Sequence, residues 1–370
     1  MKTLNSRSVT KASLTTVLCV LVLSSAGSSS GKDRAKNAPQ LAQARMSIYA
    51  TGLNNPRGLE FGPDGFLYVA EGGIGGTDPA CVVVAAVGPY TGSPTNARVS
   101  RIVNGVPVPV GDPLPSSQTS DASGNLVSGV ADVAFIGDTL YALISGAGCS
   151  HGVPTSPNEV VRLNDDGSWA QIADLSAFQV ANPVKNPEMG DFEPDGTWWN
   201  MIAVRGDLYA VEPNHGELDK ITTSGQISRI ADISATQGHI VPTALAYHGN
   251  FYVGNLNTFP IVPGSSKILK INPAGHVKVD VGGVTTVLGL VFDGRDRMYV
   301  LEASTAPGDP TPFTGKVVRV DPSGKQTEII SGLFFPTGMT LGPDGALYVS
   351  NVGFGPPPVG LGEILRIEVP

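Results

Sequence analysis

The chain has 370 residues and a net charge of −8 at neutral pH, from 24 lysines and arginines against 32 aspartates and glutamates. An acidic chain without a basic stripe argues against nucleic acids and anionic membrane surfaces as partners. Its 46 glycines and 30 prolines, with only 15% charged residues, predict many tight turns and few amphipathic helices, and its apolar content excludes a disordered chain.

The first 26 residues have the pattern of an export signal. Three positive charges (Lys2, Arg7 and Lys11) precede the short apolar run Leu14–Leu23, and small residues up to Ala26 offer a cleavage site. Removing residues 1–26 would take away these charges and no negative one, moving the net charge from −8 to −11. The run is short for a membrane span, so we expect none after signal removal, with an uncleaved anchor as the alternative. We therefore predict a secreted or periplasmic protein with a disordered linker over 27–45.

Two stretches far apart in the chain carry the same pattern. Leu53–Glu71 reads LNNPRGLEFGPDGFLYVAE, and Leu333–Asn351 reads LFFPTGMTLGPDGALYVSN. In each, an Asp-Gly turn joins two apolar runs, which predicts a β-hairpin. A hairpin cannot bury its faces alone, so its recurrence indicates a stacked repeat architecture.

Six copies of this hairpin can be aligned. Each copy has a tyrosine at the same place: Tyr68, Tyr141, Tyr209, Tyr252, Tyr299 and Tyr348. A third strand follows each copy after a loop, and in several copies a turn then leads to a fourth. Four antiparallel strands per 40–50 residues are typical of a propeller blade. We therefore predict an all-β, six-bladed β-propeller over residues 46–370.

The ends of the chain suggest how the ring closes. The last blade ends at Pro370 without a fourth strand, and Ser47–Thr51 precedes the first hairpin without a blade of its own. We expect this N-terminal strand to join the last blade, which would remove an exposed strand edge.

The repeat also predicts which face carries function. The short Asp-Gly turns lie on one face, and the long irregular segments lie on the other: Gly72–Arg98, Gly111–Gly129, Ser145–Asn158, Gln179–Trp199 and Ala303–Gly315. Long loops on one side of a rigid scaffold usually build a binding surface. Cys81 and Cys149 both fall in such loops, and Cys19 leaves with the signal. We expect Cys81 and Cys149 to form a disulfide.

No catalytic motif is present in the sequence, so candidate residues come from position alone. The starts of the first strands should line the central channel with Arg57, Ala131, Asn200, Thr243, Leu288 and Thr337. A hard cation would need several carboxylate or amide oxygens there, and Arg57 would repel it. We therefore predict no metal at this ring.

A second ring lies where the second strands reach the loop face. It contains Glu71, Glu212, Asn255, Glu302 and Asn351. These carboxylates and amides could hold Ca²⁺ or supply an acid–base pair. The alternative, which we favour, is that they cap loop backbones and face water.

Further candidates lie near the third blade. The pair Trp198-Trp199 stands beside the acidic stretch Glu188–Asp195 and suggests stacking on a flat ligand, the alternative being that one tryptophan fills the gap between blades. His215 and His239 map to the same side, where a lone histidine is more often structural. Asp132 and Arg205 are given only turn and strand-edge roles.

Three segments resemble a known family. Val241–Ile271, Tyr49–Gly73 and Leu288–Glu302 are similar to the corresponding parts of the ScyD/ScyE family of secreted six-bladed propellers. The resemblance covers essentially the whole mature chain and implies the fold and export, with no specific activity. Many relatives carry Asn-Pro-x-Gly at the start of the third blade, where this chain has Trp198–Met201. A more distant similarity is to NHL-repeat, gluconolactonase-like and quinone-dependent dehydrogenase propellers. The sequence pattern that they share specifies the structure of the blade and not the chemistry of the site.

The sequence therefore predicts an exported propeller that binds a small molecule or a protein on its loop face. The alternative is a hydrolase, lactonase-like or cyclising enzyme acting at the channel mouth, with or without Ca²⁺. We expect no cofactor beyond this possible Ca²⁺. The predicted binding residues are Arg57, Glu71, Trp198, Trp199, Asn200, Glu212, His215, Thr243, Asn255, Glu302, Thr337 and Asn351.

Overall fold

The computed structural model describes residues 44–84, 86–353 and 360–370. The predicted export signal (1–26) and residues 27–43 of the predicted linker lie outside the described residues. The first strand already begins at Arg45, so the propeller takes in the last residue assigned to the linker. No helix in the described part of the chain is long and apolar enough to cross a membrane.

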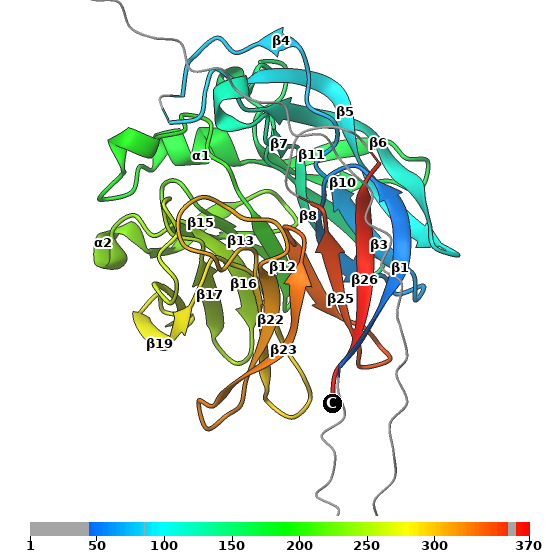
Figure 1. Cartoon of the computed structure of the whole chain (residues 1–370). Helices are drawn as coiled ribbons and strands as arrows, with labels where there is room; N and C mark the ends of the chain where they lie inside the picture. The colour runs from blue at the N-terminus through cyan, green and yellow to red at the C-terminus, as the bar shows by residue number, and fades with distance from the viewer. Residues whose placement is uncertain (1–43, 85, 354–359) are drawn as a thin grey trace, which may run out of the picture. The chain divides into compact units, whose positions relative to one another are not determined.

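Six antiparallel sheets arranged as blades make up the described chain (Figure 1). Blade one contains β2 (Pro56–Phe61), β3 (Leu67–Glu71), β5 (Thr91–Val103), β6 (Val106–Gln118) and β7 (Val127–Ser128), with β4 (Asp78–Pro79) paired to β5. Blade two contains β8 (Val130–Ile136), β9 (Thr139–Ile144), β10 (Glu159–Leu163) and β11 (Trp169–Asp174). Blade three contains β12 (Asn200–Val204), β13 (Asp207–Glu212), β14 (Glu217–Ile221) and β15 (Ile227–Asp232).

The remaining three blades follow the same order. Blade four contains β16 (Pro242–Tyr247), β17 (Phe251–Asn255), β18 (Ser266–Ile271) and β19 (Val277–Val284). Blade five contains β20 (Val287–Phe292), β21 (Met298–Glu302), β22 (Gly315–Val320) and β23 (Gln326–Leu333). Blade six contains β24 (Gly338–Leu341), β25 (Leu347–Asn351), β26 (Gly362–Glu368) and β1 (Arg45–Leu53). The prediction of an all-β, six-bladed propeller is confirmed.

The repeated residues hold the hairpin turns. In blade one, the Asp64 carboxylate accepts hydrogen bonds from Phe66 N at 3.1 Å and from the Tyr68 hydroxyl at 2.8 Å. Asp344 does the same in blade six, with Ala346 N at 3.1 Å and the Tyr348 hydroxyl at 3.2 Å. The glycine that follows each aspartate has a positive φ, which only glycine adopts without strain. Aspartate, glycine and tyrosine therefore recur because together they fix one turn.

The two ends of the chain pair within blade six, and blade six packs against blade one. β1 pairs antiparallel with β26, from Arg45 opposite Glu368 to Leu53 opposite Gly362, and Figure 1 shows this blue strand beside the red one. The inner strands of blades six and one, β24 and β2, are also in contact. Across this junction the Thr337 hydroxyl donates to Pro56 O at 2.5 Å and the Ser350 hydroxyl donates to Arg57 O at 2.6 Å.

The core is divided among the junctions between blades. Each of six apolar clusters combines buried residues of two neighbouring blades. The cluster between blades two and three, for example, contains Leu143, Trp198 and Leu208, all fully buried. Burying one large aliphatic or aromatic side chain contributes about 1.5–3 kcal/mol, so each junction stabilises the ring.

Two predicted loops are partly strands. β5 and β6 have 13 residues each and pair from Val103 and Val106 out to Thr91 and Gln118, so that residues 91–98 and 111–118 form strands within segments predicted to be irregular. Their glycines, prolines and serines hide any period-two pattern, and the register shifts by bulges. Two short helices, α1 (Leu175–Ala181) and α2 (Ser234–Gln237), also occur in the connections.

Candidate functional site

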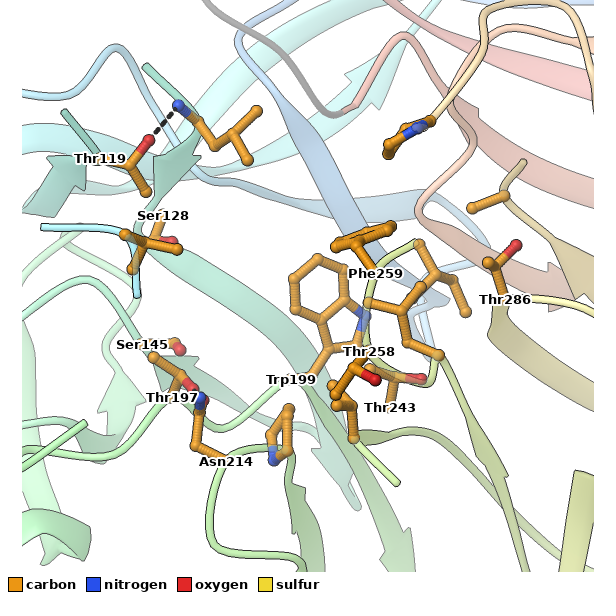
Figure 2. Close-up of a pocket in the computed structure, with 18 of the residues that line it drawn as sticks. Thr119, Ser128, Ser145, Thr197, Trp199, Asn214, Thr243, Thr258, Phe259 and Thr286 are labelled. Carbon is orange, nitrogen blue, oxygen red and sulfur yellow. Dashed lines mark hydrogen bonds between the residues drawn. The ribbon is translucent and has the colours of Figure 1, made fainter. Parts of the chain in front are cut away.

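A cavity of about 530 Å³ opens at the loop-side end of the central channel. Its wall is formed by residues before and at the start of the inner strands and by loops of blades one to five. Most of the wall is apolar: Ala86, Val87, Leu126, Ala131, Trp199, Val241, Leu256, Phe259, Ile261, Leu288, Ala303, Phe335 and Pro336. Figure 2 shows Trp199 near the middle of this wall, with the hydroxyls of Thr119, Ser128, Ser145 and Thr197 on one side of the view and Phe259 on the other.

Trp199 also lines a second cavity. The second cavity, of about 570 Å³, runs along the inner strands of the blades, and Trp199 and Leu288 line both. The guanidinium carbon of Arg57 lies 4.7 Å from the centre of the Trp199 ring. Burial lowers the pKa of Arg57 to about 9, so it is a cation at neutral pH and holds the indole by a cation–π contact.

Two carboxyl groups line the second cavity, and one of them corrects the sequence analysis. Asp132 was given a turn or strand-edge role, but it is 3% exposed and accepts hydrogen bonds from Val133 N and Met201 N, both at 2.8 Å. Burial raises the pKa of Asp132 to about 7. Burial, and then the charge of Asp132, raises the pKa of Glu60 to about 7. Asp132 therefore braces blade two against blade three inside the channel.

The predicted ring at the channel is divided between the two cavities. Arg57, Ala131 and Thr243 line the first cavity, Asn200 and Thr337 line the second, and Leu288 lines both. Asn200 also joins three blades, since its side chain donates to Asp132 and accepts from Leu245 N at 2.6 Å. Of the predicted binding residues, Arg57, Trp199 and Thr243 therefore meet at the first cavity.

The second predicted ring does not line either cavity. Its five members are at most 4% exposed, so the expectation that they face water is wrong. Four accept a backbone N–H from the loop before the inner strand: Glu71 from Asn54 at 2.6 Å, Glu212 from Thr197 at 2.9 Å, Glu302 from Thr285 at 3.1 Å and Asn351 from Phe334 at 2.9 Å. Asn255 instead donates to Ile240 O and accepts from Lys267 N, both at 2.8 Å. These residues cap loop backbones, as the alternative interpretation expected.

These caps hold strained backbone at the cavity wall. Val241, Thr286 and Phe335 line the cavity and have φ values of +55°, +42° and +42°. Left-handed φ is rare for non-glycine residues and costs on the order of 1–3 kcal/mol each. Each of these three strained residues comes directly after a residue whose backbone is hydrogen-bonded to a member of the second predicted ring. The second predicted ring thus supports the conformation of the cavity wall without lining the cavity itself.

The two tryptophans have different positions. Trp198, predicted to be exposed, is fully buried between blades two and three, and its Nε1 lies 3.4 Å from Asp219 Oδ2. Trp199 is partly exposed and lines the cavity. The ligand-stacking interpretation therefore fits Trp199, and the alternative, that one tryptophan fills the gap between blades, is correct for Trp198.

A group of titratable side chains that the sequence analysis missed also lies at the cavity. Tyr90 and Glu193 both line it, and the Tyr90 hydroxyl donates to Glu193 Oε1 at 2.9 Å. His151, fully buried behind them, places Nε2 at 3.3 Å from Glu193 Oε2. His215, a predicted site residue, does not line the cavity but binds Glu193 O through Nε2 at 3.1 Å. In the sequence, only the acidic stretch Glu188–Asp195 indicated functional residues in this region. No sequence pattern indicated Tyr90 or His151.

The disulfide lies next to this group. Cys81 and Cys149 are bonded, with 5.4 Å between their Cα atoms, which confirms the expected pairing. The bond joins the β3–β5 loop to the β9–β10 loop, and Ser150 and His151 follow Cys149 directly. The disulfide thus anchors the loop that carries His151.

The predicted Ca²⁺ ligands do not fit a cation. Calcium takes six to eight oxygen ligands, but the Glu71 carboxylate already binds Arg98, Ser100 and Asn54 N. Glu212 accepts from three backbone N–H groups, and Glu302 from Thr285 N with Lys316 beside it. Among the described residues, no three His, Cys, Asp or Glu side chains are grouped so that they could hold a metal ion.

Comparisons with solved structures support the fold. A putative oxidoreductase (glucose dehydrogenase) from Thermus thermophilus is 17% identical, with a TM-score of 0.52 over 88% of this chain and 100% of that chain. A gluconolactonase from Xanthomonas campestris is 11% identical, with a TM-score of 0.52 over 88% and 90%. A PQQ-bound aldose sugar dehydrogenase from Streptomyces coelicolor is 14% identical, with a TM-score of 0.52 over 89% and 99%. At these identities the likeness shows the propeller fold alone. No protein-family model and no curated protein matches the chain.

Proposed function

We propose that this protein binds a small, flat and largely apolar molecule in the first cavity, stacked against Trp199. The single observation that carries this proposal is the cavity itself: about 530 Å³, lined mostly by apolar side chains, with a partly exposed indole in its wall. Pockets of this size and lining are typical of sites for small organic ligands.

The fixed position of the indole supports stacking. Trp199 is held by the Arg57 guanidinium, and neighbouring blades fix Arg57, which donates to Val127 O. A rigid aromatic wall binds a planar ligand at little cost in side-chain entropy. The hydroxyls around the wall, among them Ser128 and Ser145, provide a few polar contacts without adding net charge.

Calorimetric titration with 2-methoxynaphthalene, a neutral planar probe, tests the proposal. We expect saturable one-to-one binding to the wild type and a loss of about fivefold in affinity for Trp199→Leu, since aromatic stacking contributes on the order of 1 kcal/mol beyond area burial. Trp169→Leu is the matched control, because Trp169 lies on β11 and binds Pro113 O away from the cavity. Equal affinity of both variants would contradict the proposal.

We further propose that the protein is exported after cleavage near Ala26 and is related to the ScyD/ScyE family. The signal-like residues 1–26, the Cys81–Cys149 disulfide and the resemblance of three segments support this. N-terminal sequencing of protein recovered outside the cytoplasm tests the cleavage, and an N-terminus at Met1 there would contradict it.

The alternative enzymatic hypothesis has less support. It depended on free carboxylates among Glu71, Glu212 and Glu302, and these side chains are occupied by loop backbone and by arginine or lysine. We derive no catalytic step from them.

A further inference from the structure

The polar side of the cavity has an ordered pattern of hydrogens. Tyr90, Glu193, His151, Ser150 and Asp195 lie in a row of contacts that starts at the cavity, in which all neighbours except Glu193 and His151 are joined by hydrogen bonds. Tyr90 is 4% exposed, Glu193 4%, and Ser150 and His151 are fully buried, so water cannot replace these contacts. Each hydrogen bond in this row indicates where the hydrogen of its donor lies.

Ser150 fixes the histidine. Its hydroxyl donates to Asp195 Oδ2 at 2.5 Å, so its only hydrogen is used there. The Ser150 oxygen, 3.3 Å from His151 Nδ1, can then only accept, and Nδ1 must carry a hydrogen.

His151 approaches Glu193 without forming a hydrogen bond. Its Nε2 lies 3.3 Å from Glu193 Oε2, but among the described residues neither atom has a hydrogen-bond partner. The other carboxylate oxygen, Glu193 Oε1, accepts the Tyr90 hydroxyl at 2.9 Å.

The Tyr90 hydroxyl therefore acts as a hydrogen-bond donor to Glu193. Burial, and then the Glu193 carboxylate, keeps the pKa of Tyr90 well above its ordinary value, so the hydroxyl keeps its hydrogen. Tyr90 lines the cavity, and because the hydrogen of its hydroxyl points to Glu193, the hydroxyl oxygen can only accept a hydrogen bond from a ligand. The serine and threonine hydroxyls nearby can rotate to donate or accept, so they do not impose a polarity on the ligand.

We propose that Tyr90, oriented by its hydrogen bond to Glu193 and packed against the His151 ring, is the specificity-determining residue of the cavity and selects ring compounds that carry an O–H or N–H donor. The inference rests on the proposed function, because it concerns a ligand held against Trp199 in the same cavity. A ligand that offers only an acceptor at this position would face the Tyr90 lone pairs and lose the energy of a hydrogen bond. A net hydrogen bond contributes about 1 kcal/mol, which corresponds to about a fivefold difference in affinity.

The test compares 2-naphthol with 2-methoxynaphthalene by calorimetry on the full chain. The two probes share the ring, but only 2-naphthol has a donor, and the methyl group of the other probe adds apolar surface that by itself favours binding. We expect wild-type protein to bind 2-naphthol about fivefold more tightly. Tyr90→Phe should remove this preference, and Tyr68→Phe, which removes a hydroxyl bound to Asp64 in a hairpin turn, should keep it.

A second variant tests the orientation itself. In Glu193→Gln the side-chain amide can donate to Tyr90, which frees the Tyr90 hydrogen to point into the cavity. We expect the preference to shift towards 2-methoxynaphthalene in this variant. Equal binding of both probes by wild type, or an unchanged preference in Tyr90→Phe, would overturn the inference and leave the proposed function standing. Failure of the wild type to bind either probe would overturn the proposed function as well.

Discussion

Glu302 accepts a hydrogen bond from Thr285 N at 3.1 Å, directly before Thr286, whose φ of +42° places it in the left-handed region. Thr286 lines the cavity, and its hydroxyl donates to Ser304 O at 2.6 Å. A buried carboxylate at the end of β21 thus holds a strained residue directly before β20, the strand that pairs with β21. The same relationship joins Asn351 to Phe334, the residue before Phe335. The conformation of the cavity wall depends on these caps.

Removing the Glu302 cap should therefore destabilise the fold. We expect Glu302→Ala to lower the free energy of unfolding by about 1–3 kcal/mol, because Thr285 N–H would be left buried without its acceptor. Glu302→Gln keeps an acceptor oxygen and should cost less. The control is Glu328→Ala, because Glu328 contacts the same Lys316 from an exposed position and should change stability by less than about 0.5 kcal/mol. Urea denaturation would show these differences, and a Glu302→Ala effect no larger than that of the control would contradict this role.

Substitutions of the adjacent residues Trp198 and Trp199 should have separate effects, one on the stability of the fold and the other on ligand binding. Trp198 is fully buried in the junction between blades two and three, so Trp198→Ala should lower the free energy of unfolding by about 3–5 kcal/mol. Trp199→Leu should change stability little and weaken the binding of 2-methoxynaphthalene. Thermal melting and calorimetry of the two variants measure both effects. Comparable destabilisation by the two changes would mean that Trp199 is also a core residue.

The fold could be predicted from the sequence because the repeat is local. Asp344 and Tyr348 are four residues apart and bond to each other within one hairpin, as Asp64 and Tyr68 do, so the turn chemistry is visible in the sequence. The position of the channel ring followed from the strand order. This part of the candidate site, with Arg57 and Thr243, could thus be predicted.

The rest of the site depends on contacts between blades, which no local pattern reveals. Tyr90, His151 and Glu193 come from three loops without periodicity and meet only because the blades pack side by side. Asp132 was missed for a related reason. Its carboxyl group occupies the space that a side chain at Gly58 would need, since a Cβ atom at Gly58 would lie 1.7 Å from Asp132 Oδ1. The glycine of blade one therefore leaves room for the carboxyl group of blade two.

Asp132 should make stability depend on pH. Its pKa is raised by burial from 3.8 to about 7, so between these values the folded protein holds a proton that the unfolded chain releases. The free energy of unfolding should therefore fall as pH rises from about 4 to about 7, by up to about 4 kcal/mol from this group, and Glu60 acts in the same direction. Asp132→Asn should flatten this fall in urea denaturation at pH 4.5, 6 and 7.5. The exposed Asp166→Asn is the control, and an Asp132→Asn slope equal to wild type would rule out this origin.

The disulfide should support both the fold and the polar wall of the cavity. Cys81 and Cys149 are 68 residues apart, and cross-linking a loop of this length stabilises a protein by up to about 4 kcal/mol through the unfolded chain. Because Ser150 and His151 follow Cys149, the reduced protein should also lose order in the chain of groups behind Tyr90. We expect Cys81→Ser/Cys149→Ser to melt at a lower temperature and to bind 2-naphthol and 2-methoxynaphthalene with more nearly equal affinity. A variant that melts lower but keeps the full preference for 2-naphthol would show that the loop holds His151 without the disulfide.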